Sequence, residues 1–255
     1  MKLTLRCVSA VAGLILAASN AHAVSSGEAS AFGVQIDVTA ALVLNETLGP
    51  VPTAVVAAPP SGSDSDLLVD LTGLSPLISS GTASVQASVD LGIPEATASA
   101  ILEDAGVGLS VSILLDDLSL EITADEIFSS ASATGAGPIS LAGDATLTNT
   151  FITVNDVTFG VDSEDFDTPN SEFLPGVFNP LGIQIILNEQ ILGPGEITVN
   201  AMHIYFNPPT LGDLGLVSGE IILSQSHAQL VPEPSTGLLL GLGLLGLAGR
   251  RLRAR

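Results

Sequence analysis

The sequence predicts an all-β fold, an antiparallel β-sandwich, with a signal helix at its N-terminus and a single transmembrane helix at its C-terminus. The sandwich is indicated by apolar residues that alternate with polar ones at a period of two, a pattern that recurs along the 255-residue chain. Clusters of Gly, Pro, Asn and Asp, which are typical of turns, separate the alternating segments. Many strands along one chain, each with one apolar and one polar face, favour two packed antiparallel sheets.

The alternating segments define the predicted strands. In the first, residues 31–40, Phe32, Val34, Ile36 and Val38 are expected on one face of the strand. The pattern continues in seven further segments: 83–91, 107–113, 118–123, 157–161, 182–187, 195–206 and 216–225. Two long connections are rich in Pro, Gly and Ser or in acidic residues, and both are predicted as surface loops: 46–66 and 162–180.

The N-terminal segment, residues 1–23, has the three parts of a secretory signal peptide. Two basic residues come first, and an apolar run covers residues 8–18. Ala21 and Ala23 then give the small-x-small pattern at which signal peptidase cleaves. Cleavage there leaves Val24 as the first residue of the mature chain and predicts export through the Sec translocon.

The last 25 residues differ in composition from the rest of the chain. A Val-Pro-Glu-Pro motif is followed by an uncharged span over 235–249 that Leu and Gly dominate. A helix of that length reaches about 22 Å, which is less than the roughly 30 Å hydrocarbon core of a membrane. Basic residues beside such a span stay in the cytoplasm, so the final arginines are predicted as a cytoplasmic stop. The motif comprises Val231, Pro232, Glu233 and Pro234, and the stop comprises Arg250, Arg251, Arg253 and Arg255.

This order of motif, apolar span and arginine cluster resembles the PEP-CTERM sorting signal. The resemblance covers residues 231–255. It implies that the chain is a substrate of exosortase, a membrane protease-transpeptidase of Gram-negative bacteria that produce exopolysaccharide. It also implies that the tail anchors the protein in the inner membrane only until the tail is processed.

Between the two signals, residues 24–230 are predicted to form one acidic domain. This segment contains no lysine, arginine or cysteine. Of the 27 acidic residues in the chain, only Glu233 lies outside it. Nucleic acid is excluded as a partner, because phosphate contacts need basic side chains. The absence of cysteine excludes disulfides and thiol chemistry from the domain.

The domain resembles the choice-of-anchor P family of β-rich surface domains, over roughly residues 28–228. The similarity is clearest in the last third, where the segments L-P-G, N-E-Q and V-N-A-x-H-I follow one another. It implies a surface location and a β-rich architecture, and the family has no established activity. The residues that carry the similarity are Asn188, Glu189, Gln190, Val199, Asn200, Ala201 and His203.

The sequence gives little support to an enzymatic function. His203 and His227 are the only histidines in the domain, and no nucleophile-elbow or zinc-helix motif accompanies them. We expect His203 to be a strand histidine whose hydrogen bonds are satisfied. The absence of Trp and the single Tyr argue against a glycosidase or a lectin. An uncharacterised hydrolase is the second alternative, and no cofactor is expected apart from calcium.

Two binding functions form the first alternative. Calcium takes six to eight oxygen ligands, and one acidic stretch offers several of them: Asp162, Glu164, Asp165 and Asp167. Ice binding would be served by a row of Thr146, Thr148 and Thr150 on one face of a strand, although threonine is favoured in strands generally.

The sequence thus predicts a non-enzymatic surface protein that is exported, held transiently in the inner membrane by its C-terminal helix, and then processed by exosortase. The Sec translocon, signal peptidase and exosortase are the expected partners on this route. The final location is predicted as the cell surface or the extracellular matrix, where exopolysaccharide is the expected partner.

Overall fold

The computed structural model describes residues 24–40, 44–113, 116–135, 138–206 and 217–232. The predicted signal helix at 1–23 and the predicted transmembrane span at 235–249 lie outside these residues. Among the residues described, no helix is long and apolar enough to cross a membrane.

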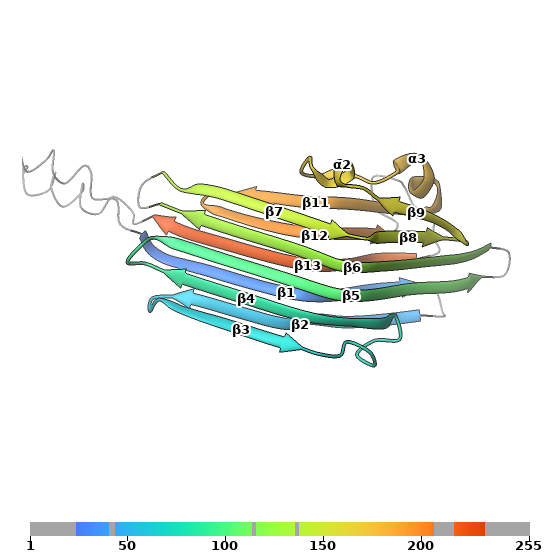
Figure 1. Ribbon diagram of the computed structural model, residues 1–255, viewed down its shortest axis with the longest axis horizontal. Coiled ribbons are helices and arrows are strands. Elements are labelled where there is room, and N and C mark those ends of the chain that lie inside the picture. Colours follow the sequence, from blue (N-terminus) through green and yellow to red (C-terminus); the bar gives the residue numbers. More distant parts are fainter. Residues whose placement is uncertain (1–23, 41–43, 114–115, 136–137, 207–216, 233–255) are drawn as a thin grey trace, which may run out of the picture.

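Two antiparallel sheets make up the domain (Figure 1). Sheet A contains, in spatial order, β10 (Ser171–Glu172), β11 (Ile183–Gly193), β12 (Glu196–Phe206), β13 (Val217–Pro232), β1 (Val24–Ala40) and β2 (Leu44–Ala58). Sheet B contains β3 (Gly62–Leu68), β4 (Ile78–Asp90), β5 (Glu95–Ile113), β6 (Asp116–Thr134), β8 (Thr150–Val154) and β9 (Val157–Val161), and β7 (Ser140–Thr148) also pairs with β6. Between β9 and β11 lie α2 (Ser163–Phe166), α3 (Pro175–Phe178) and a 3-10 helix (Asn179–Leu181).

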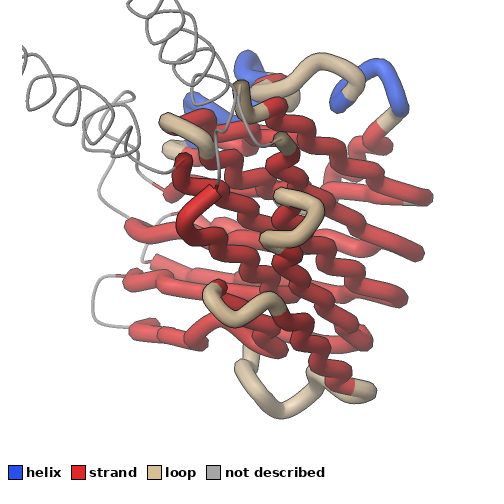
Figure 2. The backbone as a smooth tube through the Cα atoms, turned by 90° about the vertical axis from the view of Figure 1, so that its left-hand side faces the viewer, coloured by secondary structure: helices blue, strands red, loops and turns tan. Residues whose placement is uncertain are grey.

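The sheets pack face to face, as the view along the strands shows (Figure 2). Their inner faces form one core, which is built mainly from alanine, valine, leucine and isoleucine. Small side chains are frequent on the core side of the long strands, for example Ala29 and Ala31 in β1 and Ala98 and Ala100 in β5. The predicted all-β fold is therefore confirmed, and the two facing sheets form a sandwich.

The side of strand β1 that faces the core changes once along its length. Ala29 and Ala31 are buried ahead of Gly33, whereas Val34 and Ile36 are buried behind it. Because side chains alternate strictly in a regular strand, this change needs a residue that does not follow the pleat. A β-bulge, or a residue with left-handed backbone angles, provides such an interruption.

The same interruption crosses sheet A from strand to strand. In β13 it lies at Ser224, which has a φ of 58°, and in β11 it lies at Asn188, which has a φ of 48°. The neighbouring residues stay in register, since Leu223 pairs with both Val34 of β1 and Met202 of β12. A line of irregular residues therefore runs across the sheet from strand to strand.

Sheet B has a matching line. Asp104 in β5 has a φ of 51°, and Asn149, between β7 and β8, has a φ of 47°. The buried positions of β5 accordingly change from even to odd numbers, from Leu102 to Ala105 and Val107. Left-handed backbone angles are uncommon outside glycine, and Asn and Asp tolerate them best. This tolerance explains the residue types in the line.

The interruption in β1 corrects one prediction from the sequence. Val34, Ile36 and Val38 are buried on one face, as predicted. Phe32 precedes the change at Gly33, so it lies on the other face and is half-buried. Because Gly33 has no side chain, the order of apolar and polar residues does not reveal the change of face.

The predicted loop at 46–66 is wrong, because most of this segment belongs to β2 and β3. Its buried residues alternate, with Pro52, Ala54, Val56 and Ala58 facing the core. Proline is depleted in strands because it lacks an N–H, yet an edge strand tolerates it. Both strands are edges, β2 of sheet A and β3 of sheet B.

Aspartate side chains accept hydrogen bonds from backbone N–H groups on these two edge strands. The Asp64 carboxylate accepts hydrogen bonds from the N–H groups of Val55 on β2 and Ser65 on β3, each at 3.0 Å. The Asp66 carboxylate accepts one from the N–H of Leu67 at 2.9 Å. Unpaired edges invite pairing with other chains, so these aspartates protect the sandwich from edge-to-edge association.

The predicted acidic loop at 162–180 contains short helices that three phenylalanines fix to the domain. Phe166, Phe173 and Phe178 are buried. The ring centroid of Phe178 lies 5.8 Å from that of Phe159 and 5.9 Å from that of Phe173. Aromatic side chains bury large apolar areas, and the segment is therefore packed against the sandwich.

Three fully buried serines link the two sheets. The Ser224 hydroxyl of sheet A donates to the Ala100 carbonyl oxygen of sheet B at 2.8 Å. Ser226 and Ser129 share a hydrogen bond of 2.8 Å between their hydroxyls, and the Ser129 hydroxyl oxygen also lies 3.0 Å from that of Ser224. Buried hydroxyls are costly without partners, so this cluster favours one alignment of the sheets.

The left-handed residue in β5 can be tested directly, because the Asp104 side chain is exposed. Asp104→Gly should keep or raise the free energy of unfolding, whereas Asp104→Val should lower it by about 1–2 kcal/mol, since a branched residue is strained at this φ. Urea unfolding of both variants measures the difference. Glu121→Val, at an exposed ordinary position in β6, should stay within about 0.5 kcal/mol. Equal stability of the two Asp104 variants would contradict the prediction.

Candidate functional site

The predicted sorting motif begins at the end of strand β13. Pro232 pairs with Val24, and Val231 pairs with Ser26, at the margin of the β1–β13 ladder. Val231 is 39% exposed and Pro232 is exposed. The first two motif residues therefore lie at the surface, where the ordered sheet ends.

The residue before the motif is the last core residue of the described chain. Leu230 is completely buried. Its N–H donates a hydrogen bond of 2.9 Å to the carbonyl oxygen of Gly195, in the turn between β11 and β12. The sorting motif thus begins directly after the last buried residue of the described chain, and its first two residues still pair with β1.

Both predicted processing sites lie at the same end of the sandwich. Val24, the predicted first residue of the mature chain, is paired with Pro232, and the chain enters and leaves the domain side by side (Figure 1). The remaining residues predicted for the signal-peptide cleavage site and for the sorting signal lie outside the described part of the chain: Ala21, Ala23, Glu233, Pro234, Arg250, Arg251, Arg253 and Arg255.

A second polar site, which we call the His203 cluster, lies on the side of sheet A that faces away from sheet B. Its residues come from β11, β12 and β13. The His203 Nδ1 atom lies 2.7 Å from Glu189 Oε2, and the His203 Nε2 atom lies 3.1 Å from Glu220 Oε2. These are the only ion pairs among the described residues. A carboxylate can only accept, so His203 donates from both nitrogens, as an imidazolium does.

Further residues complete the His203 cluster. Asn200 donates from Nδ2 to Glu189 Oε2 at 2.6 Å, and the Tyr205 hydroxyl donates to Glu189 Oε1 at 3.0 Å. Gln225 donates from Nε2 to the Asn200 side-chain oxygen at 2.6 Å. The rings of His203 and Tyr205 are in contact and tilted by 32°, with centroids 3.8 Å apart. Both oxygens of Glu189 are therefore hydrogen-bonded.

Burial and hydrogen bonding act on Glu189 in opposite directions. Burial by itself would raise the pKa of the Glu189 carboxyl. The hydrogen bond and charge of His203, with the donors Asn200 and Tyr205, outweigh burial and lower that pKa. Burial and the Glu189 carboxylate raise the pKa of Tyr205. The His203 cluster thus holds a buried ionised carboxylate together with a neutral phenol.

The sequence predicted part of this arrangement. His203 is a hydrogen-bonded strand histidine, as expected. The segments N-E-Q and V-N-A-x-H supplied Glu189, Asn200 and His203, but nothing in their spacing places them against one another. The pairing of β11 with β12 brings Glu189 opposite Asn200. Glu220 and Gln225 were missed, because they come from β13 and only the sheet topology brings them close.

Two of the four predicted calcium ligands cap a short helix in the structure. Asp162 is the N-cap of α2, and the Asp165 carboxylate accepts a hydrogen bond of 2.8 Å from its N–H. Glu164 and Asp167 are exposed. Nowhere in the described ranges do three or more His, Cys, Asp or Glu side chains group closely enough to hold a metal ion. The calcium site stays a prediction from the sequence.

The predicted threonine row is wrong. Thr146 is half-buried and Thr148 is exposed, both on β7, whereas Thr150 on β8 is 1% exposed. Asn149, with its φ of 47°, lies between them and turns the chain to its other face. The three threonine side chains therefore do not form one flat row for ice.

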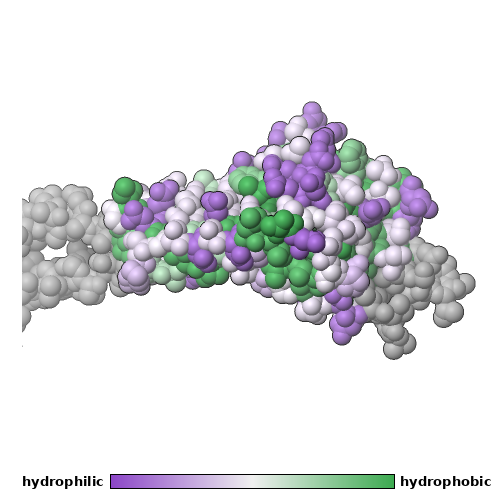
Figure 3. All heavy atoms as spheres, turned by 60° about the horizontal axis from the view of Figure 1, so that its bottom comes forward, coloured by the Kyte–Doolittle hydropathy of each residue, from purple (hydrophilic) through white to green (hydrophobic). Residues whose placement is uncertain are grey.

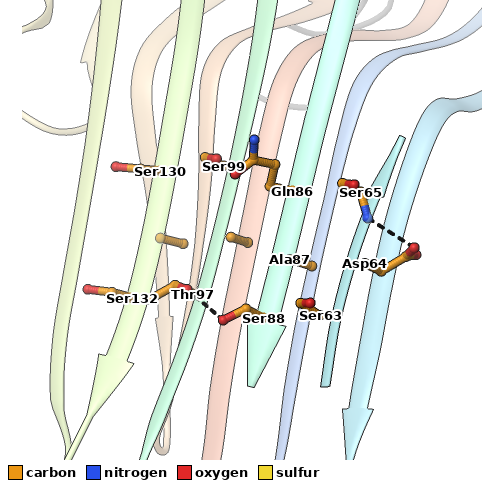
Figure 4. Close-up of a pocket in the computed structure, with 12 residues that line it drawn as sticks. Ser63, Asp64, Ser65, Gln86, Ala87, Ser88, Thr97, Ser99, Ser130 and Ser132 are labelled. Carbon is orange, nitrogen blue, oxygen red and sulfur yellow. Dashed lines mark hydrogen bonds between the residues drawn. The ribbon is translucent and has the colours of Figure 1, made fainter. Parts of the chain in front are cut away.

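A shallow groove of about 770 Å³ crosses the outer face of sheet B (Figure 4). Two rows of polar side chains line it, and each row follows the register of β3, β4, β5 and β6. The rows are Ser63, Ser88, Thr97 and Ser132, and Ser65, Gln86, Ser99 and Ser130. Asp64 is the one charged residue that lines the groove. The sequence prediction missed the groove because it assigned residues 62–66 of β3 to a loop.

Apolar side chains are exposed along the side of the molecule that carries the edge strands β2 and β3 (Figure 3). Leu67 is 63% exposed, Val69 is 70% exposed and Val55 is 56% exposed. Single exposed apolar residues are common on protein surfaces.

Comparison with known proteins identifies one segment. Residues 230–253 match the family model described as the PEP-CTERM protein-sorting motif. No curated protein and no solved structure matches the chain. The match confirms the PEP-CTERM signal predicted from the sequence and supports an exosortase-sorted surface protein. Such a signal implies export and processing of a C-terminal membrane anchor.

The lowered pKa of Glu189 predicts how stability depends on pH. A carboxyl whose folded pKa lies below its unfolded value stabilises the fold above the unfolded value, here 4.5, and loses that contribution as the pH falls through the folded pKa. The free energy of unfolding should therefore fall more steeply between about pH 5 and pH 3 in the wild type than in Glu189→Gln. Urea unfolding at each pH measures both slopes.

A core variant distant from the His203 cluster provides the control for this measurement. Leu120→Ala removes a buried side chain from β6 and should keep the wild-type slope, although its stability is lower at every pH. The same slope in Glu189→Gln and in the wild type would show that Glu189 does not contribute.

Proposed function

We propose that this protein is a non-enzymatic, exported surface protein whose acidic sandwich is separated from its membrane tail by exosortase near Pro232, Glu233 and Pro234. The observation that carries the proposal is the position of the matched motif, which starts where the sandwich ends. After processing, the domain joins the outer surface or the exopolysaccharide matrix.

The site of cleavage is compatible with a folded product. Leu230 is the last buried residue in the part of the chain that the structure describes, and Val231 and Pro232 are exposed. Cleavage beyond Val231 therefore removes no core side chain. One peptide bond is broken: the acyl group at the end of the domain is transferred to water or to an amine acceptor, and the tail leaves with the nitrogen of the broken bond, which takes up a proton and becomes its new N-terminus. The domain keeps both sheets and the core in either case.

The route to the surface follows from the two terminal signals. Signal peptidase cleaves between Ala23 and Val24 after the chain crosses the Sec translocon. The uncharged span at 235–249 then holds the domain outside the inner membrane, and the four final arginines stop transfer. The remaining attachment, beyond Pro232, is at one end of the sandwich, so the rest of the domain projects away from the bilayer.

The absence of enzymatic activity is part of the proposal. In the His203 cluster, both nitrogens of His203 and both oxygens of Glu189 are engaged with other members of the cluster. A catalytic base needs a free position toward a substrate, and this network supports a structural role instead. The resemblance to the choice-of-anchor P family is in line with the same proposal, because Glu189, Asn200 and His203 of the cluster lie in the segments that carry it.

The proposal predicts the mass of the mature protein. In a bacterium that carries an exosortase, the recovered chain should begin at Val24 and end between Val231 and Pro234. Intact-mass and C-terminal peptide measurements on the envelope and matrix fractions test this. Recovery of a chain that still ends at Arg255 from the membrane would mean a permanent anchor and would reject the proposal.

Motif variants provide the matched comparison. Glu233→Ala combined with Pro234→Ala should leave most of the protein uncleaved in the membrane, because the recognition residues are lost. Glu172→Ala combined with Pro169→Ala changes the same residue types at exposed positions of the domain and should be processed like the wild type. Processing of the motif variant at the wild-type rate would show that these residues are not recognised.

A further inference from the structure

Four turns of the sandwich lie at the end where the chain enters and leaves the domain (Figure 1). The strand register places the β2–β3, β4–β5, β6–β7 and β11–β12 turns at the same end as the pair of Val24 and Pro232. We call the described residues of these turns, together with the last two residues of β11, the turn platform. It comprises residues 59–61, 91–94, 135, 138–139 and 192–195.

Hydrogen bonds connect three of these turns. The Leu91 N–H, in the β4–β5 turn, donates to the Ser61 hydroxyl oxygen in the β2–β3 turn at 3.0 Å. The Gly135 N–H, in the β6–β7 turn, donates to the Pro94 carbonyl oxygen of the β4–β5 turn at 2.9 Å. The three turns are therefore held to one another across the end of the sandwich.

The fourth turn, between β11 and β12, packs against the same end. The Gly195 carbonyl oxygen accepts a hydrogen bond of 2.9 Å from the Leu230 N–H. A Cβ atom at Gly195 would lie 3.1 Å from Ile139 Cδ1 and 2.5 Å from the Leu230 carbonyl oxygen. The turn therefore fits closely between the β6–β7 turn and the end of β13, and the turn platform is one connected surface.

The turn platform is uncharged, and apolar side chains project from it. None of its described residues is an aspartate, glutamate, lysine or arginine. Ile93 is 72% exposed and Leu192 is 66% exposed. Pro59 and Pro60 are exposed as well. Apolar residues that gather at one exposed end of a domain are typical of an interaction surface.

The opposite end of the sandwich differs in charge. It also exposes apolar side chains, since Val69 is 70% exposed and Val157 is 55% exposed. Each of these has an aspartate as its neighbour in the chain, Asp70 and Asp156. The segment 162–167 adds four more acidic residues there. In a domain without lysine or arginine, the turn platform is therefore the end with uncharged turns.

The carboxylates nearest to the turn platform belong to the strands beside it. The Asp90 carboxylate accepts a hydrogen bond of 2.8 Å from the Gly92 N–H, which supports the β4–β5 turn. The Glu196 carboxylate accepts one of 2.8 Å from Gln229 Nε2. Glu95 pairs with Asp90 in the ladder of β4 and β5. These acidic residues disfavour an anionic surface, so a surface of uncharged lipid headgroups suits the turn platform best.

We propose that the turn platform is a membrane-facing surface: while the C-terminal anchor is attached, Ile93 and Leu192 enter the headgroup region of an uncharged lipid bilayer and hold the strands upright on it. This inference rests on the membrane anchor of the proposed function. The described chain ends at Pro232, beside the turn platform, so the tail that follows brings the bilayer to this end of the sandwich.

The contact needs the tether. Two apolar side chains give a weak interfacial contact by themselves, and a covalent anchor raises the effective concentration of the bilayer at the turn platform. Removal of the tail therefore also ends this contact. While the tail is attached, the groove of sheet B and the His203 cluster lie on the outer faces of the sheets and remain clear of the bilayer.

The experiment uses the signal-processed chain with its tail, produced in a bacterium without exosortase and reconstituted into phosphatidylcholine vesicles that contain a nitroxide-labelled lipid. The segment 24–255 has no cysteine, so Ile93→Cys and Val69→Cys each provide one site for an environment-sensitive fluorophore. These residues are almost equally exposed, at opposite ends of the sandwich. Quenching by the nitroxide lipid should be at least about threefold stronger at position 93 than at position 69.

A second pair of variants tests whether the apolar side chains cause the contact. With the fluorophore on Leu192→Cys, the change Ile93→Glu should lower the quenching at least about twofold, because a carboxylate opposes insertion, whereas Ile93→Leu should leave it unchanged. Addition of phosphatidylglycerol to the vesicles should also lower the quenching at position 93.

Three results would overturn the membrane-facing surface. The first is equal quenching at positions 93 and 69 in a chain that floats with the vesicles. The second is an unchanged signal at position 192 in Ile93→Glu. The third is a fluorophore at position 93 that is shielded from water but not quenched, since this indicates contact with a second copy of the chain. A chain that does not float with the vesicles rejects the anchor of the proposed function, and the membrane-facing surface with it.

Discussion

The absence of lysine and arginine between residues 24 and 230 governs how this sandwich is held together. No carboxylate can be neutralised by a long basic side chain, so stability comes from the apolar core and the backbone ladders. Carboxylates act mainly as hydrogen-bond acceptors instead. Asp64 and Asp66 accept N–H groups at the sheet edges, and Asp165 accepts one at the start of α2. Glu189, the one buried carboxylate in the described part of the chain, is different: it needs an ionic partner, and His203 is the residue that supplies it.

The lines of left-handed residues explain how long strands keep an apolar core on one side. Each line lets a strand change the set of residues that it buries, and the lines cross both sheets at Ser224 and Asn188 in one and at Asp104 and Asn149 in the other. Ser224 has a second role, because its hydroxyl reaches the Ala100 carbonyl of the opposite sheet. One residue therefore interrupts its own strand and also fixes the alignment of the two sheets, which the nondirectional apolar contacts alone would leave free to slide.

The sequence predicted the fold class, because period-two alternation is a local property of each strand. The same pattern failed at Phe32, since a change of face at Gly33 leaves no mark in the order of apolar and polar residues. It failed again at 46–66, where prolines and glycines are typical of loops and the edge positions that tolerate them depend on the whole sheet. Of the candidate sites, the sorting motif was predicted fully because it is contiguous. The His203 cluster was predicted only in part, since three strands must pair before Glu220 meets His203.

Charge and sorting are connected in the proposed pathway. All six basic residues of the chain lie in the two terminal signals, two before Val24 and four after Pro234. While the tail is attached, its arginines lie at the cytoplasmic side of the membrane, and the acidic domain lies outside. Processing at both ends removes every lysine and arginine. The titratable groups of the product are then its carboxylates, two histidines, one tyrosine and the two chain ends. Anionic lipid surfaces repel such a domain over roughly a Debye length, about 8 Å at physiological salt. Removal of the tail therefore ends the covalent attachment and leaves a domain that the membrane surface does not retain, which favours its transfer outward.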